Sequence, residues 1–414
     1  MTDALEKSRV RLGFIPLNDC APMAAAQEKG FFAEEGLTVD LSREASWANI
    51  RDKVQVGVLD GAHMLAPMAV ASSLGIGGER VEMAVPMALN LNGSAITVSR
   101  AMADAMRMLD PEGMAARPRT ARPLKRLIEM RRRGGQPPLT FGVVFPYSIH
   151  NYELRYWMAA GGVDPDRDVR LKVIPPPRLV GQLSAGEIDG FCVTAPWNAL
   201  AVHEGLGEIL LFSSEWWGSG PDKVFGMRAD WADRHPNTTQ ALLRALLKAA
   251  VWADAPENRA EMAAILARMI YVDVPEDVVR LSLVGSPPYA PGEAGSASLD
   301  YLVYHRYAAS FPWRSHAIWF LSQMVRWGQA PRNADFAAAA QVYRPDLYRI
   351  AARQLNQPAP LVDLKREGEH DRPWTLDAAT SPIAMAADSF LDGAVFDPTC
   401  PVEYIDGFAA AQDA

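Results

Sequence analysis

The sequence predicts an α/β protein of two lobes, each a parallel sheet with helices on both faces, followed by a helical C-terminal region. Three observations support this fold class. Short apolar strands alternate with helices of about ten to fifteen residues in both halves of the chain, an order typical of parallel sheets. One short motif recurs in both halves at the same internal spacing. At 414 residues and 49% hydrophobic residues, the chain is long enough to build two cores.

The first lobe begins with a strand over Val10–Pro16. Asp19 and Pro22 then mark the start of a helix that Gly30 ends, because proline favours the first turn and glycine the residue after the last. A second strand follows around Leu37–Leu41. This strand–helix–strand order predicts the first parallel pair of the sheet.

A second helix of the first lobe is expected after Ser46, a good N-cap residue with Asn49 three positions later, and it ends at Gly57. Trp47 therefore lies at a helix amino terminus. Its indole is both a large core filler and an N–H donor suited to a polar opening, and both interpretations stay open.

The repeated motif gives the clearest sign of two similar lobes. Residues 57–67 read GVLDGAHMLAP and residues 186–196 read GEIDGFCVTAP, so that glycine, Asp-Gly and Ala-Pro recur at matching positions. Each copy follows a short helix and leads a short strand into a helix that begins with proline. We interpret the repeat as two lobes on one plan, in which Asp60 and Asp189 form turns at strand entry and are not catalytic acids.

The second lobe is organised around Leu139–Gly162, where a buried strand precedes Pro146 and Ser148 then caps an aromatic-rich helix. The amino terminus of a helix presents free N–H groups and the positive end of the helix dipole. His150 lies in the first turn of this helix, either as a ligand-binding residue or as a histidine that satisfies the helix end.

The lobes are expected to face each other across a cleft, because ligands of such sheets sit outside the carboxyl ends of the strands. A basic excursion connects the lobes, and it is either a partner surface or a solvated helix. The expected segments are 9–100 for the first part of lobe 1, 101–138 for the excursion, 139–222 for lobe 2, 223–355 for the return to lobe 1 with C-terminal helices, and 356–414 for a linker and docked tail.

Composition argues against several classes of function. A net charge of −8 is poorly suited to direct nucleic-acid binding. The three cysteines are far apart in sequence, and the other six histidines have no metal-site spacing, so we expect neither disulfides nor a metal centre. No P-loop, HExxH, GxSxG or usable GxGxxG motif occurs, and we expect no enzyme and no cofactor. We also find no export signal or membrane span, which predicts a cytoplasmic protein.

Four ordered stretches, covering roughly Arg9 to Leu355, carry a family resemblance. They are GFIPLNDCAPMAAAQEKGFFAEEGL, ASWANIRDKVQVGVLDGAHMLAPM, HNYELRYWMAAGGVDPDRDV and DKVFGMRADWADRHP. Together they resemble the nitrate/bicarbonate-binding family of ABC-transporter solute receptors. The resemblance implies the type II periplasmic-binding-protein fold, with a small planar oxyanion held in the cleft.

The resemblance also implies four ligand-binding residues, which are Trp47, Ser94, His150 and Lys223. Transport receptors of the family carry an amide side chain at the Ser94 position. Lys223 would supply a full positive charge, and its replacement by alanine is expected to weaken anion binding without unfolding the chain. A cationic His150 would bind the anion better than a neutral one, so affinity would fall as pH rises through its pKa. No carboxylate matches a calcium-assisted bicarbonate site at these positions, which favours nitrate or nitrite.

Within the family, a member without an export signal resembles the cytoplasmic nitrate/nitrite sensors. By that resemblance the chain would hold an ANTAR-type RNA-binding antiterminator protein inactive until the anion binds. The alternative in the same fold is the substrate-binding component of a nitrate ABC transporter. From another class, a pyrimidine-synthesising enzyme shares this fold, but its cysteine-rich iron motif is missing here.

Overall fold

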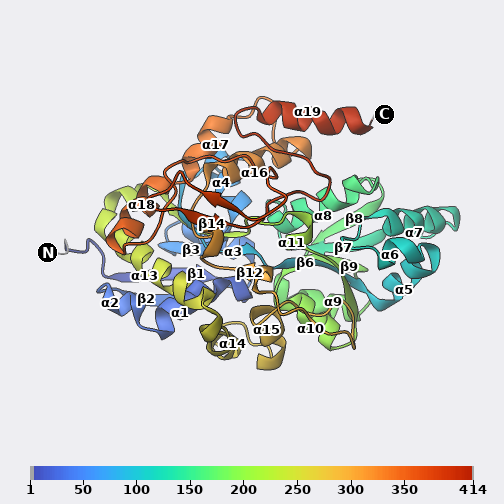
Figure 1. Ribbon diagram of the computed structural model, residues 1–414, viewed down its shortest axis with the longest axis horizontal. Helices are drawn as coiled ribbons and strands as arrows, with labels where there is room; N and C mark the ends of the chain where they lie inside the picture. Colours follow the sequence, from blue (N-terminus) through green and yellow to red (C-terminus); the bar gives the residue numbers. More distant parts are fainter. Residues whose placement is uncertain (1–3, 413–414) are drawn as a thin grey trace.

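The computed structural model describes residues 4–412 and contains two α/β lobes side by side, with the C-terminal region across one side of both (Figure 1). The lobe 1 sheet has the order β2(Thr38–Arg43), β1(Arg9–Phe14), β3(Gly61–Leu65), β11(Lys223–Arg228), β4(Met83–Ala88). The lobe 2 sheet has the order β8(Val169–Val173), β7(Leu139–Val143), β9(Gly190–Thr194), β6(Ser94–Ser99), β10(Gly207–Phe212). The prediction of a two-lobed α/β fold is confirmed.

Both sheets are mixed, so the expectation of purely parallel sheets is wrong. In lobe 1, β11 runs antiparallel to both β3 and β4, and in lobe 2, β6 runs antiparallel to both β9 and β10. The physical reason is the path of the chain. β6 enters lobe 2 from lobe 1, and β11 returns in the opposite sense, so each sheet contains one strand that arrives from the other lobe.

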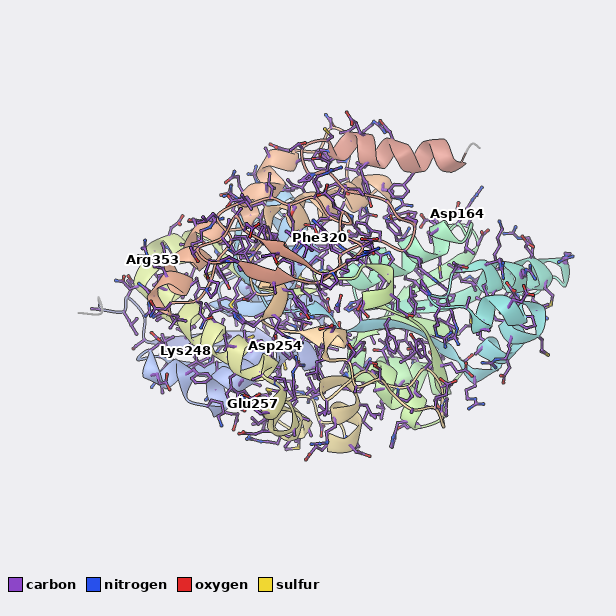
Figure 2. All side chains as sticks on the ribbon, viewed as in Figure 1. Asp164, Lys248, Asp254, Glu257, Phe320 and Arg353 are labelled. Carbon is purple, nitrogen blue, oxygen red and sulfur yellow. The ribbon has the colours of Figure 1, made fainter. Side chains whose placement is uncertain are left out.

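The crossing begins earlier than expected, because β6 already belongs to the second sheet at Ser94 and not after residue 100. A short pair of strands, β5(Leu91–Asn92) and β12(Leu302–Val303), lies beside the crossing. Asp254, labelled in Figure 2, anchors the chain after β12 by accepting the backbone N–H groups of Tyr304 and Arg306 at 3.2 and 2.8 Å. The chain segments between the lobes are therefore held together by backbone hydrogen bonds.

The two predicted N-caps are confirmed. Ser46 accepts the N–H of Asn49 ahead of α3(Trp47–Gln55), and Ser148 accepts that of Asn151 ahead of α8(Ile149–Ala160). The repeat gives β3 and β9, the central strands of the two sheets. Its aspartates cap strand entry, because the Asp60 carboxylate accepts the N–H of Arg11 and that of Asp189 accepts the N–H of Thr140.

The remaining helices cover the sheets and build the C-terminal region. Lobe 1 carries α1(Ala21–Glu28), α2(Phe31–Glu34), α4(Ala66–Leu74), α12(Ala229–Arg234), α13(Pro236–Asp254) and α14(Arg259–Ala267). Lobe 2 carries α5(Arg100–Leu109), α6(Pro111–Ala115), α7(Arg122–Arg133), α9(Leu179–Ser184), α10(Trp197–His203) and α11(Ser213–Trp216). The C-terminal part adds α15(Glu276–Leu283), α16(Arg314–Arg326), α17(Phe336–Val342), α18(Pro345–Gln354), β13(Trp374–Leu376), β14(Ile383–Met385) and α19(Pro401–Gln412).

The basic excursion forms α5 to α7, at the outer end of lobe 2 (Figure 1). Several of its arginines pair with acids of the same lobe, including Arg122 with Asp110 at 2.7 Å and Arg132 with Asp168 at 2.6 Å. These pairs favour the interpretation as a solvated helix over a partner surface. Among the helices of residues 4–412, none has the length and apolar character needed to cross a bilayer.

Candidate ligand-binding site

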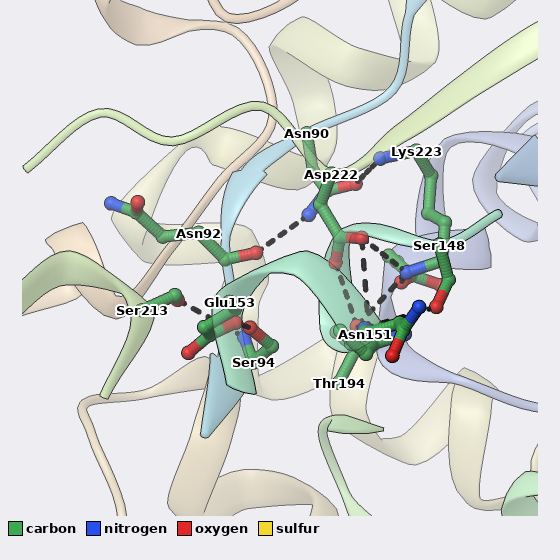
Figure 3. Close-up of polar contacts among 12 residues, drawn as sticks. Asn90, Asn92, Ser94, Ser148, Asn151, Glu153, Thr194, Ser213, Asp222 and Lys223 are labelled. Atoms are coloured by element: carbon green, nitrogen blue, oxygen red, sulfur yellow. Dashed lines mark hydrogen bonds and ion pairs between the residues drawn. The ribbon is translucent and has the colours of Figure 1, made fainter. Parts of the chain in front are cut away.

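A buried polar cluster joins the two lobes at the start of β11. Lys223 is fully buried, and three oxygen atoms lie around its Nζ, as many as an ammonium has N–H groups. Nζ is 2.8 Å from Asp19 Oδ2, 2.5 Å from Asp222 Oδ1 and 2.9 Å from Thr194 Oγ1. Figure 3 shows Asp222 and Thr194 converging on Lys223. The lysine charge is thus already balanced by carboxylates, and it is not the free cation expected from the sequence.

The charges of this cluster are set by mutual contact. Burial alone would lower the pKa of Lys223, but the Asp19 and Asp222 carboxylates raise it above its ordinary value. Burial alone would raise the pKa of Asp19, yet Lys223 and His63 lower it below its ordinary value. The pKa of Asp222 is raised by burial and by the charge of Asp19, against the opposing effect of Lys223. The group therefore contains one ammonium and two carboxyl groups.

His150 enters the cluster through Thr194. Its Nε2 lies 2.7 Å from Thr194 Oγ1, and that hydroxyl donates to Asp222 Oδ2 at 2.6 Å. Because the single hydroxyl proton goes to Asp222, we assign the proton of the neutral imidazole to Nε2, which donates to Thr194. Burial and the charge of Lys223 lower the pKa of His150 well below its ordinary value. The imidazole is therefore neutral near pH 7, so the stronger binding predicted for a cationic His150 does not apply at that pH.

Trp47 from lobe 1 packs beside the cluster. The Trp47 ring lies with its centroid 5.7 Å from Lys223 Nζ and contacts the His63 ring edge-on at 5.2 Å. Trp47 Nε1 and the side-chain amide of Asn18 are buried and have no hydrogen-bond partner within residues 4–412. A buried N–H group without an acceptor costs about 1–3 kcal/mol. Such groups mark positions where a ligand acceptor would be stabilised.

Ser94 is connected to Lys223 through Thr194. It pairs directly with Thr194 across β6 and β9, and its hydroxyl bonds to the carboxyl of Glu153 on α8 (Figure 3). Burial raises the pKa of Glu153 to about 8, and the charge of Asp222 adds to this effect against the hydrogen bond from Ser94. The structure thus brings Trp47, His150 and Lys223 around one cluster, and it connects Ser94 to that cluster through its neighbour in the sheet.

Sequence reasoning missed the acidic and hydroxyl members of the site. The sequence predicts a helix start at Asp19 and includes His63 only among the histidines without metal-site spacing, yet their side chains lie 2.8 Å apart beside Lys223. Asp222 directly precedes Lys223, and Thr194 ends the strand of the second repeat. Strand-end positions of the repeat were the available signal, because the carboxyl ends of the central strands face the cleft. Pairing across lobes could not be derived from spacing.

The site is closed between the lobes. Direct contacts across the cleft include the Asn18 N–H to the Ala195 carbonyl at 2.8 Å and the Trp197 indole N–H to the Pro16 carbonyl at 3.2 Å. Trp47, His150, Thr194 and Lys223 are each at most 1% exposed. A ligand can therefore reach them only when the lobes separate. Within residues 4–412, no three His, Cys, Asp or Glu side chains are grouped to hold a metal ion.

Comparisons with known proteins agree with this architecture. A model of the NMT1-like family matches residues 3–267. The nitrate/nitrite binding protein NrtA of Nostoc sp. strain PCC 7120 is 33% identical over 407 residues, which cover 97% of this chain and 86% of that protein. The nitrate import ATP-binding protein NrtC of Synechocystis sp. strain PCC 6803 is 36% identical over 99% of this chain, which spans only 57% of that protein's length.

A solved structure shows the same fold over nearly the whole molecule. The crystal structure of the periplasmic nitrate-binding protein NrtA from Synechocystis PCC 6803 superposes with a TM-score of 0.85 at 32% identity, covering 98% of this chain and 100% of that one. The chain is therefore a member of the NMT1-like family and has the two-lobed periplasmic-binding-protein fold of NrtA.

Proposed function

We propose that this chain is a solute receptor that binds nitrate or nitrite between its lobes and serves a nitrate ABC transporter. The observation that carries the proposal is the buried indole N–H of Trp47, which has no hydrogen-bond partner within residues 4–412 and belongs to a ring 5.7 Å from Lys223 Nζ. A small anion with several oxygens needs convergent donors and nearby positive charge, and it needs no nucleophile. The names of the NrtA relatives support nitrate and nitrite as the anions.

Four side chains surround the anion in this proposal. Trp47 donates through Nε1, and Lys223 supplies charge at short range while Asp19 and Asp222 hold it in place. His150 orients Thr194 and forms a wall of the site. Ser94 contacts the anion from the lobe 2 side. Lobe closure then brings donors from both sheets onto one ligand.

Isothermal titration with nitrate, nitrite and bicarbonate tests this function. We expect heats of binding with nitrate or nitrite. Replacing Trp47 by phenylalanine removes one N–H donor and should weaken binding about tenfold to a hundredfold, the value of a hydrogen bond to a charged group. Trp231→Phe is the matched control, because this indole donates to Asp60 at 2.9 Å, outside the cluster. Absence of binding to both nitrogen oxyanions would refute the proposal.

The sensor role implied by the resemblance uses the same site and stays a prediction. In that role an ANTAR-type antiterminator binds the open, empty protein, and the anion releases it because each ligand weakens the binding of the other. Size-exclusion chromatography of the chain with such an antiterminator distinguishes the two roles. A complex that separates on addition of nitrate or nitrite supports the sensor, whereas no complex in either condition supports the transport receptor.

A further inference from the structure

Among residues 4–412, Glu153 is a buried carboxyl group without a cationic partner. Asp19 and Asp222 share Lys223, but Glu153 forms no ion pair within the part of the chain that the structure describes. It is fully buried on α8, and its Oε1 has no hydrogen-bond partner among residues 4–412. An isolated carboxylate in such a place is costly, so the group keeps its proton. Burial accordingly raises the pKa of Glu153 to about 8.

Two independent elements place Glu153 beside the anion site. His150 and Glu153 are three residues apart on α8 and therefore share one face of the helix. Ser94 and Thr194 are directly opposite in the β6–β9 pair, where side chains on the same face lie about 5 Å apart. The Ser94–Glu153 and Thr194–His150 hydrogen bonds connect the helix pair to the strand pair. Glu153 is therefore hydrogen-bonded to the site through Ser94, just as His150 is hydrogen-bonded to it through Thr194.

The proton of Glu153 decides what Ser94 can offer to a ligand. A neutral carboxyl can donate its O–H to Ser94 Oγ, which leaves the serine proton free to point at an anion. An ionised carboxylate only accepts, so it draws the serine proton toward itself and turns the oxygen lone pairs of Ser94 toward the site. Ionisation also adds a second uncompensated negative charge next to Asp222. Both changes oppose the binding of an anion.

We propose that Glu153 is a positioning residue of the anion site, which as a neutral acid makes Ser94 a hydrogen-bond donor to the bound anion. This inference rests on the anion-binding function proposed above. It implies that nitrate or nitrite is held only while Glu153 carries its proton, so anion and proton are bound together above the pKa of this group.

Of the titratable groups that face Glu153, Asp222 pairs with the Lys223 ammonium at 2.5 Å, and the other four keep their charge state in this range. These five groups are Lys223 from β11, Asp222 directly before that strand, Cys192 from β9, Tyr301 from the turn before β12, and His150 from α8. Burial raises the pKa of Cys192 and of Tyr301 well above their ordinary values, and burial lowers that of His150, so these three are neutral. Lys223 stays charged, since Asp19 and Asp222 raise its pKa. Glu153 is therefore the group expected to ionise between about pH 7 and 9.

Titration calorimetry of the full chain with sodium nitrate, from about pH 6 to 9.5, tests the proposal. We expect affinity to be constant below about pH 7 and to fall about tenfold per pH unit above 8, as one proton is lost. Near pH 9, titrations in two buffers of different ionisation enthalpy should show uptake of about one proton per nitrate bound. Constant affinity together with no proton uptake would overturn the role of Glu153 while leaving the receptor function in place.

Glu153→Gln identifies the group that takes the proton. The amide is neutral at every pH and can donate to Ser94, so this variant should bind nitrate as the native chain does near neutrality and show no loss at high pH. Asp166→Asn is the control, because Asp166 is an exposed acid outside α8 that pairs with Arg155 of α8 at 2.7 Å. This variant should keep the alkaline loss. An alkaline loss that persists in Glu153→Gln would overturn the proposal.

Measurements on the native chain also decide two further cases. If Glu153→Gln does not fold, the proton uptake of the native protein at high pH still decides for or against the proposal. If nitrate and nitrite fail to bind near pH 7, the receptor function fails, and this inference fails with it.

Discussion

At the residue scale, Lys223 is a buried ammonium whose charge is balanced by two carboxylates. The ammonium is buried, and its partners Asp19 and Asp222 are equally inaccessible to water. Removing one member of a buried ion pair leaves uncompensated charge in a place that water does not reach. Lys223 therefore contributes to folding as well as to any ligand contact, which sequence reasoning had separated.

Lys223→Met should lower the free energy of unfolding by about 3–5 kcal/mol, because both carboxylates lose their counter-ion. Urea denaturation near neutral pH measures this change. The double variant Lys223→Met/Asp222→Asn should recover part of the loss, since one of the stranded charges is gone. A single variant within about 1 kcal/mol of the native chain would contradict this view of the cluster.

His150 gives a second prediction at this scale. Because burial and Lys223 lower its pKa, the imidazole stays neutral, and nitrate affinity should be constant between about pH 5.5 and 7. We therefore no longer expect affinity to fall with rising pH in this range because of His150. Calorimetry over this range checks this prediction. A tenfold decrease of nitrate affinity with rising pH that disappears in His150→Gln would show that the imidazole is protonated.

At the element scale, α8 carries both His150 and Glu153, and its amino terminus is fixed by Ser148. The Ser148 hydroxyl accepts the N–H of Asn151 at 3.1 Å and donates to the Phe145 carbonyl at 2.7 Å. One side chain thus caps the helix and connects it to the segment that follows β7. The position of the site residues depends on this cap.

Ser148→Ala should destabilise the protein by about 1 kcal/mol, the usual cost of a lost N-cap, and should also weaken nitrate binding because α8 shifts. Ser99→Ala is the matched control. Ser99 caps α5 in the same way, by accepting the N–H of Met102, but α5 carries no residue of the site. Thermal melts and calorimetry should show similar stability losses and a binding defect in Ser148→Ala alone.

At the scale of the whole molecule, the C-terminal region packs against both lobes, and its helices α16 and α17 lie against α4 of lobe 1. Phe390 stacks on Tyr156 of α8 with ring centroids 5.9 Å apart, and it contacts Trp217 at 4.6 Å. The chain before it is anchored by a buried cluster in which Glu367 pairs with Lys365 and accepts a hydrogen bond from Ser315 at 2.7 Å. The arrangement of the lobes therefore depends in part on a segment far from the site.

Glu367 makes this region sensitive to acid. Burial alone would raise its pKa, but Lys365 and His316 lower it to about 2. A carboxyl group whose pKa is lower in the folded than in the unfolded protein stabilises the fold at pH values above its unfolded pKa. This stabilisation is lost as the pH falls through the folded pKa. The contribution is about 3 kcal/mol from a shift of this size.

Unfolding free energies measured by urea denaturation from pH 6 down to about 2.5 should therefore fall in the native chain below about pH 4.5. Glu367→Gln should be less stable at pH 6, and the difference between the two proteins should shrink as pH falls. A difference that is independent of pH would show that Glu367 contributes through packing and not through its charge.

The sequence by itself determined the elements and their plan. Apolar alternation, proline and glycine positions and the Ser46 and Ser148 caps are local signals, and each is satisfied by neighbours within a few residues. The repeated motif predicted the two strands β3 and β9 and the role of Asp60 and Asp189, because in both copies the aspartate forms the turn at strand entry. The structure places these strands at the centre of the two sheets. Trp47 and His150 were candidates because each lies at a helix amino terminus, whereas Ser94 and Lys223 came from the family resemblance alone.

Only the tertiary structure decided which charged groups of the site pair with one another and how their pKa values shift. Asp19, Thr194 and Lys223 are far apart in the chain, and their contacts exist only because β11 returns from lobe 2 and the two sheets meet. Burial and pairing shift pKa values through distance and solvent exposure, and neither is a local property of sequence. The same reason explains why Glu153 passed unnoticed, since a carboxyl on an aromatic helix becomes a neutral acid only where the fold excludes water and withholds a counter-ion.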